Sequence, residues 1–244
     1  MKIIPVLMLC ITVSLNATAS EKAHWDYSDK KGPSHWAELD THNFMCDKGK
    51  NQSPINIIQS DKTQLDDIDF NYSSTMKNII NNGHTVQINM NPGSSIKIEN
   101  LSYELKQFHF HTPSENKIKS KSYPLEAHFV HQNKAGKLAV IAVMFDTTEK
   151  NKELSKLWQA IPDEQFKTKD LVSPGSVMAL LPKNKAYYRF NGSLTTPPCS
   201  EGVRWYVMKN PITISKSQVK TFHHAVKHDN NRPIQELNAR VILQ

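Results

Sequence analysis

The sequence predicts a single sheet-dominated α+β domain with short helices at its periphery. Through the middle of the chain, short runs rich in β-branched and aromatic residues alternate with turn-rich segments, which is typical of strands. Helical periodicity is limited to two short stretches. No internal repeat, low-complexity stretch or linker rich in Gly, Ser or Pro divides the chain, so we expect one mainly β domain over residues 21–244.

Five segments are predicted strands because β-branched and aromatic residues recur in them, partly in alternation with polar ones. They are residues 84–90 (HTVQINM), 96–98 (IKI), 105–110 (LKQFHF), 125–131 (LEAHFVH) and 138–145 (LAVIAVMF).

Two stretches are predicted helices. The first covers residues 151–160 (NKELSKLWQA). The second begins at Ser215, where Ser215 and Gln218 fit a capping box. The apolar face of this second helix is marked by Val219, Phe222 and Val226.

Composition and charge narrow the class of protein. Hydrophobic residues make up 38% and charged residues 22% of the 244, a globular balance that excludes wholesale disorder. The formal net charge of +7 is spread along the chain, without the block of like charges that is typical of nucleic-acid-binding arms. No segment after the N-terminus is apolar for long enough to span a bilayer. We therefore expect no nucleic-acid partner and no stable membrane insertion.

Residues 1–20 are predicted to be a secretory signal peptide. Lys2 gives a positive start, residues 3–15 are almost wholly apolar, and Ala17-Thr18-Ala19 is a small-x-small cleavage signal. The alternative, an ordinary buried N-terminal segment, fits less well because the polarity changes abruptly at Ser20. We expect the mature protein to be exported.

Export affects how the three cysteines are interpreted. Cys10 is removed with the signal peptide, which leaves Cys46 and Cys199. In an oxidising compartment a disulfide is the favoured state of such a pair, and two buried free thiols are the alternative. A bridge across so long a loop would stabilise the fold by roughly 4–5 kcal/mol in the chain-entropy description.

Three histidines form a potential metal site on two of the predicted strands. His109 and His111 are two residues apart, so they share one strand face while the phenylalanines between and before them share the other. If the 125–131 strand pairs with this one, His128 can face the same side. Three neutral imidazoles on rigid strands suit a catalytic zinc site with one position open to water. A half-exposed polar strand face, another metal or a structural zinc are the alternatives from spacing alone.

Two polar residues share the side of the histidines by the same alternation. Gln107 precedes His109 by two residues, and Glu126 precedes His128 by two. They are placed to accept hydrogen bonds from the imidazoles and so to fix their tautomers. By contrast, His224 and His228 are four apart in the second helix with no third ligand nearby, and we expect them to be surface residues.

The two strands with the histidines, together with several further segments in the same order along the chain, resemble the α-class carbonic anhydrases. The resemblance covers essentially the whole mature sequence. The resemblance implies a twisted, mostly antiparallel sheet of about ten strands, with zinc at the bottom of a conical cleft. The segments that carry it are His24-Trp25 with Tyr27, Gly32 to Trp36, Asn51 to Ile57, Asn82-Gly83-His84, Gln107 to His111, Glu126 to His131, and Gly192 to Pro198.

The resemblance also implies roles for individual residues. His109, His111 and His128 would be the zinc ligands. Thr195 would accept a hydrogen bond from zinc-bound hydroxide and donate one to Glu115. Gln107 and Glu126 would accept hydrogen bonds from His109 and His128, and the Asn230 backbone carbonyl would accept one from His111. Thr196 would contact bound bicarbonate. The apolar wall that receives carbon dioxide would consist of Val130, Val140, Leu194, Val203 and Trp205.

Further implied roles concern the proton and the covalent structure. His84 matches the proton-shuttle position, and an imidazole near its unperturbed pKa of about 6.5 suits that task. Tyr27 matches a residue that orders water along the route. Gln87 departs from the Asn that is more common in the family by one methylene, and we expect it to be a contact of the solvent network or of the cleft. Cys46 and Cys199 match the disulfide of exported members.

The implied activity is reversible hydration of carbon dioxide to bicarbonate and a proton, by attack of zinc-bound hydroxide. A non-catalytic binding domain is the first alternative, but it would be expected to have lost zinc histidines, and all three are present. A dedicated zinc esterase is the second alternative, but it would need a larger pocket than the one that Val130, Val140 and Val203 indicate. The resemblance to bacterial members favours a periplasmic location, with secretion second. Whether the chain is a monomer or a homodimer stays open.

Overall fold

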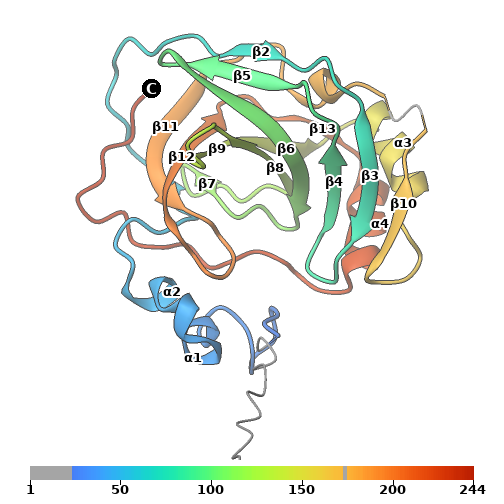
Figure 1. Cartoon of the computed structure of the whole chain (residues 1–244), viewed down its shortest axis with the longest axis horizontal. Coiled ribbons are helices and arrows are strands. Elements are labelled where there is room, and N and C mark those ends of the chain that lie inside the picture. Colours follow the sequence, from blue (N-terminus) through green and yellow to red (C-terminus); the bar gives the residue numbers. More distant parts are fainter. Residues whose placement is uncertain (1–23, 173–174) are drawn as a thin grey trace, which may run out of the picture.

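The computed structural model describes residues 24–172 and 175–244, whose strands form one large mixed sheet and one small sheet (Figure 1). The large sheet has 11 strands in the order β10-β3-β4-β6-β8-β9-β12-β11, with β13 beside β9 and with β5 joining β2 to β6. Among the described strands of the large sheet, only the pairs of β9 with β12 and of β9 with β13 are parallel. The predicted sheet-dominated, mostly antiparallel fold is confirmed. The predicted signal peptide and Cys10 lie outside the described residues.

The strands and helices have the following bounds. The large sheet contains β2 (Asp69–Asn71), β3 (Met76–Asn81), β4 (Val86–Met90), β5 (Ser95–Ile98), β6 (Leu101–His111), β8 (Leu125–Gln132), β9 (Leu138–Thr147), β10 (Lys167–Asp170), β11 (Tyr187–Ser193), β12 (Glu201–Met208) and β13 (Ile212–Ile214). The small sheet pairs β1 (Asn56–Ile57) with β7 (Lys117–Ile118). The helices are α1 (Trp36–Leu39), α2 (Met45–Lys48), α3 (Lys152–Ala160) and α4 (Lys216–Val226), with 3-10 turns η1 (Thr41–Asn43) and η2 (Val177–Leu180).

All five predicted strands are found, as β4, β5, β6, β8 and β9, and two of them, β4 and β6, begin two or more residues away from the predicted position for local reasons. β4 starts two residues late because the Asn82 side chain accepts the N–H groups of His84 and Thr85 and so makes a turn there. β6 begins at Leu101 because its polar first half pairs with β5. Pairing between strands can extend a strand beyond its apolar pattern.

Both predicted helices are confirmed together with their N-terminal caps. Asn151 accepts the N–H groups of Glu153 and Leu154 at the start of α3. At the start of α4 the capping box of Ser215 and Gln218 is formed in both directions. On the apolar face of α4, Phe222 and Val226 are buried, whereas Val219 is partly buried against the core.

The main hydrophobic core lies on the sheet face opposite the three histidines. Phe108, Phe110 and Phe129 alternate with the histidines along β6 and β8 and are fully buried there. The rings of Trp158 in α3 and Phe222 in α4 stack with their centroids 5.6 Å apart, and the Phe110 ring packs edge-on against Trp158 with a centroid distance of 4.9 Å. This packing anchors the histidine strands from behind.

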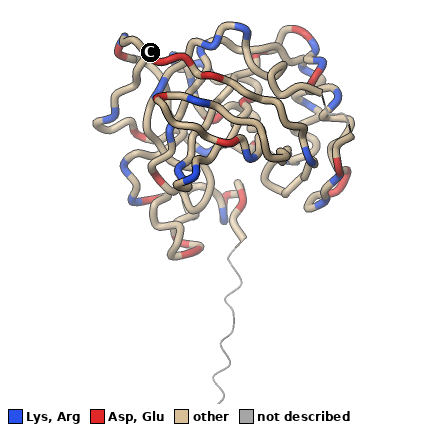
Figure 2. Tube along the Cα trace, turned by 45° about the horizontal axis from the view of Figure 1, so that its top comes forward, with Lys and Arg blue, Asp and Glu red and all other residues tan. Residues whose placement is uncertain are grey.

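The charged residues are interspersed along the trace (Figure 2), as the even spread of charge in the sequence predicts. In the described ranges, every helix falls short of the length and apolar character that crossing a membrane requires.

His131 of β8 is buried on the core face, away from His128. The Tyr72 hydroxyl donates to its Nε2 at 2.8 Å, and its Nδ1–H donates to the Ala139 carbonyl at 3.3 Å. Burial lowers the pKa of His131 to about 3, against a smaller opposing effect of its backbone hydrogen bonds. The ring is therefore neutral in the folded protein.

This buried imidazole makes the fold sensitive to acid. The pKa of His131 lies below its unfolded value of about 6.5, so the unfolded chain takes up the proton first and stability falls as the pH drops below that value. We expect His131 to remove about 2 kcal/mol of the free energy of unfolding between about pH 7.5 and pH 5. In His131→Gln this contribution is absent, so the free energy of unfolding should depend less on pH than in wild type. Denaturant unfolding of both proteins at both pH values measures the difference. Equal pH dependence in the two proteins would contradict it.

Candidate metal centre

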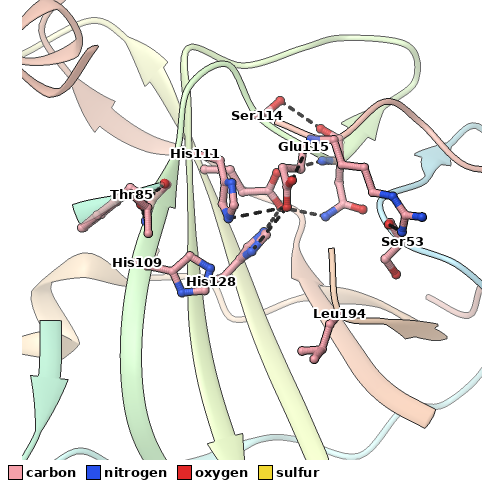
Figure 3. Close-up of polar contacts among 12 residues, drawn as sticks. Ser53, Thr85, His109, His111, Ser114, Glu115, His128 and Leu194 are labelled. Atoms are coloured by element: carbon pink, nitrogen blue, oxygen red, sulfur yellow. Dashed lines mark hydrogen bonds and ion pairs between the residues drawn. The ribbon is translucent and has the colours of Figure 1, made fainter. Parts of the chain in front are cut away.

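Three histidines converge on one face of the large sheet (Figure 3). His109 and His111 come from β6 and His128 from β8, and the antiparallel register sets His109 directly opposite His128. One nitrogen of each ring lies within 4.8 Å of the others. His111 and His128 are buried, with exposed fractions of 1% and 2%. The sequence placed these three side chains together correctly.

Each of these imidazoles has its other nitrogen paired. Gln107 Oε1 lies 2.8 Å from His109 Nδ1, the Asn230 carbonyl 2.7 Å from His111 Nδ1, and Glu126 Oε1 2.9 Å from His128 Nε2. Oxygen acceptors at these positions hold the ring protons. The lone pairs of His109 Nε2, His111 Nε2 and His128 Nδ1 therefore face one another.

Burial keeps the three rings neutral, as metal ligands must be. It lowers the pKa of His109 well below its usual value, and the neighbouring His111 and His128 add to the effect. It also lowers the pKa of His128. The pKa of His111 falls less because the Asn230 carbonyl favours its protonated form. His111 Nε2 is buried without a hydrogen-bond partner among the described residues, so the cluster fits a bound cation.

Glu126 is held rigidly behind His128. Asn116 donates to it twice, from its backbone N–H at 2.8 Å and from its side-chain amide at 2.7 Å. Burial raises the pKa of Glu126 to about 7, and the hydrogen bonds from Asn116 oppose the rise. Asn116 therefore fixes the carboxylate that orients His128.

Glu115 lies beside the free nitrogens of two of the histidines (Figure 3). Its Oε2 is 3.5 Å from His111 Nε2 and 3.8 Å from His128 Nδ1. Its Oε1 accepts the backbone N–H of Arg232 at 2.9 Å. Burial raises the pKa of Glu115 to about 8, and hydrogen bonds from Arg232 and the Thr195 side chain oppose the rise.

A cavity of about 130 Å³ opens from the histidines toward the N-terminal segment. Of the residues predicted from the sequence, it brings together His84, Tyr27, Gln87 and Thr196 with the ligand strand β6. Its full lining is Trp25, Tyr27, Asn82, His84, Thr85, Gln87, Gln107, His109, His111 and Thr196.

The five predicted apolar residues form a continuous cluster on the histidine face. They are the buried Val140, Val203 and Trp205, with the partly buried Val130 and Leu194 packed against them. The Trp205 ring packs edge-on against the His128 ring, with 4.9 Å between the ring centroids. The cluster therefore borders the metal centre directly.

The disulfide between Cys46 and Cys199 is formed. It joins α2 to the loop between β11 and β12, which also carries Thr195. The sequence left open a disulfide or two buried free thiols, and the structure shows the disulfide.

His84 differs from the expectation of an unperturbed imidazole. Its ring stacks on Trp25 at 3.8 Å. Burial lowers the pKa of His84 to about 4, and the nearby His24 and His228 lower it further. The predicted value near 6.5 is thus wrong, because the sequence pattern does not show that Trp25 covers the ring.

Arg232 is a buried cation that sequence reasoning missed. Its Nη1 donates to Gln52 Oε1 and the Ser53 carbonyl, both at 2.8 Å, and its Nη2 donates to the Cys46 carbonyl at 2.9 Å. Only 2% of the residue is exposed. It lies in a segment without regular structure, so no periodicity marks it. The only signal in the sequence that could have pointed to Arg232 is its position two residues after Asn230.

The comparisons with known proteins agree with this geometry. The sequence model of the eukaryotic-type carbonic anhydrase family matches residues 31–244. A carbonic anhydrase of Pectobacterium carotovorum is 46% identical over 237 residues, which cover 97% of each chain. The α-carbonic anhydrase of Thermovibrio ammonificans, solved with the inhibitor sulfanilamide, is 45% identical with a TM-score of 0.89, over 91% of this chain and 99% of that one. That of Photobacterium profundum is 47% identical with a TM-score of 0.86, over 91% and 100%.

We expect Arg232→Met to lower the free energy of unfolding by about 3–5 kcal/mol. The substitution leaves three buried carbonyl acceptors unpaired and removes the positive charge nearest Glu115. Denaturant unfolding measures the loss. Lys156→Met, which breaks an exposed pair with Glu153, is the control and should lose little. Equal losses in the two variants would contradict the role assigned to Arg232.

Proposed function

The chain belongs to the α-class carbonic anhydrase family, whose reaction is the reversible hydration of carbon dioxide, and we propose that it performs this reaction with zinc held by His109, His111 and His128. The observation that carries the proposal is the set of three converging, unpaired imidazole nitrogens. Nitrogen ligands from three histidines with one position open are typical of catalytic zinc.

Zinc bound there would supply, as in carbonic anhydrases generally, a water whose pKa is lowered to about 7. Three neutral imidazoles would add no negative charge to the metal. Gln107, Glu126 and the Asn230 carbonyl hold the three rings in the tautomers that the metal needs.

Thr195 and Glu115 orient the nucleophile in this proposal. Thr195 accepts a hydrogen bond at its hydroxyl oxygen and donates its own proton to Glu115, which directs a lone pair of the nucleophile toward the substrate. The support is the Thr195 side chain close enough to Glu115 to lower the pKa of that carboxyl, and the fixed position of Glu115 on the Arg232 backbone.

The apolar cluster of Val130, Val140, Leu194, Val203 and Trp205 receives carbon dioxide. Carbon dioxide carries no net charge, so an apolar wall binds it without desolvating a charge. Its tight packing against Trp205 supports a small substrate rather than a bulky ester. Thr196, at the cavity wall, contacts bicarbonate.

His84 carries the released proton from the cavity to buffer, and Tyr27 orders water along the way. Both residues line the cavity that opens from His109 and His111. The disulfide supports export, and we propose a periplasmic location.

Replacing a ligand tests the metal and the reaction together. His109→Ala should reduce bound zinc from one per chain to near none and abolish rapid carbon dioxide hydration, because two imidazoles bind zinc far more weakly than three. Stopped-flow hydration and metal analysis on the same samples measure both. His224→Ala, at an exposed position of α4, should match wild type. Full hydration by the zinc-free variant would overturn the proposal.

Removing the shuttle tests the path of the proton. His84→Ala should lower kcat on the order of 10- to 100-fold in a buffer of low concentration and leave kcat/KM unchanged, because proton release follows the hydration step. Added imidazole should restore kcat. An unchanged kcat, or a loss that imidazole does not rescue, would exclude His84 as the proton carrier.

A further inference from the structure

His228 lies outside the cavity, but it packs against the turn that carries His84. α4 ends at Val226, and Lys227 adopts a left-handed conformation with φ of 69°, which turns His228 away from the helix. Its Nε2 is 3.2 Å from the Gly83 carbonyl, and its Nδ1 is 3.1 Å from the Asp229 carbonyl. Its ring lies 5.4 Å from that of Tyr27. His228 is partly buried and follows the helix, so its predicted place in the same helix as His224 is wrong.

The hydrogen-bonding direction at His228 follows from its partners. Carbonyl oxygens only accept, so the ring donates to Gly83 and to Asp229. A neutral imidazole has one N–H and satisfies one of the two carbonyls, whereas the protonated ring satisfies both. The contact with Gly83 is the one that reaches another element of the fold.

The turn that His228 contacts is held at several other points. Asn82 Oδ1 accepts the N–H groups of His84 and Thr85 at 3.0 and 2.8 Å, and Asn230 Nδ2 donates to the His84 carbonyl at 3.0 Å. Gly83 has φ of +82°, and a Cβ there would lie 2.7 Å from the Phe166 ring. The Gly83 carbonyl is thus a defined position in a tight turn, and its donor is His228.

Several other groups surround His228. Tyr27 and Asp229 contact it, while the Asp229 carboxylate lies 3.1 Å from His223 Nε2. Lys227 precedes it in the chain. The contact by which His228 reaches the His84 turn is the one with the Gly83 carbonyl.

We propose that His228 is a positioning residue for proton transfer: its ring N–H holds the Gly83 carbonyl and hence the turn that carries His84. The proposal rests on the shuttle role proposed for His84.

Two variants test the donor role. His228→Ala removes the donor to the Gly83 carbonyl, whereas His228→Gln keeps an amide donor near the position of Nε2. His84→Ala reports the full shuttle contribution. His224→Ala, an exposed histidine of α4, is the matched control.

The measurement is stopped-flow carbon dioxide hydration at low and high imidazole on the zinc-loaded full chain. His228→Ala should lower kcat about three- to tenfold at low imidazole, because one hydrogen bond to the His84 turn is lost, with kcat/KM unchanged and kcat restored by imidazole. His228→Gln should keep kcat near that of wild type. His224→Ala should match wild type at both imidazole concentrations.

Three results would overturn the proposal. If His84→Ala lowers kcat but His228→Ala does not, His228 has no positioning role and the shuttle assignment stands. If His228→Ala lowers kcat and kcat/KM equally, its effect is general structural damage. If His84→Ala itself leaves kcat unchanged, the shuttle assignment fails, and the role of His228 fails with it.

Discussion

The antiparallel register between β6 and β8 is the constraint on which the site depends. It sets His109 opposite His128 and leaves His111 on the same face two residues along. Because side chains alternate along a strand, a slip of one residue would turn His128 to the other face of the sheet and break the cluster. The phenylalanines between the histidines pack into the main core, so the same register that fills the core also assembles the metal centre.

Burial makes the polar groups around the histidines interdependent. An unpaired polar group at this depth costs free energy, so each ring nitrogen that faces away from the centre has an oxygen acceptor. Glu126, one of these acceptors, is held in turn by Asn116, and the neighbouring Glu115 is held by the Arg232 backbone. The geometry of the three histidines is therefore set by residues outside the cluster.

The segment from His228 to Arg232 joins the parts of the active centre that lie far apart in sequence. His228 contacts the turn of His84, and Asn230 binds the carbonyl of His84 with its amide and the ring of His111 with its own carbonyl. Arg232 supports Glu115 with its backbone and the Cys46 region with its side chain. One short stretch without regular structure thus contacts the turn of His84, the ring of His111 and the disulfide loop.

The sequence by itself determined the features that depend on neighbouring residues. Strand alternation placed His109, His111, Gln107 and Glu126 on one face, and Ser215 with Gln218 marked the start of α4, because these patterns extend over a few residues. Motif order identified the family and with it the expected roles of residues such as Thr195. Only the tertiary structure decided the rest: the burial of Arg232, the stacking of Trp25 on His84 that lowers its pKa, and the contact of His228 with Gly83. Those features arise from contacts between segments distant in the chain, and burial and electrostatic neighbours are properties of the assembled fold.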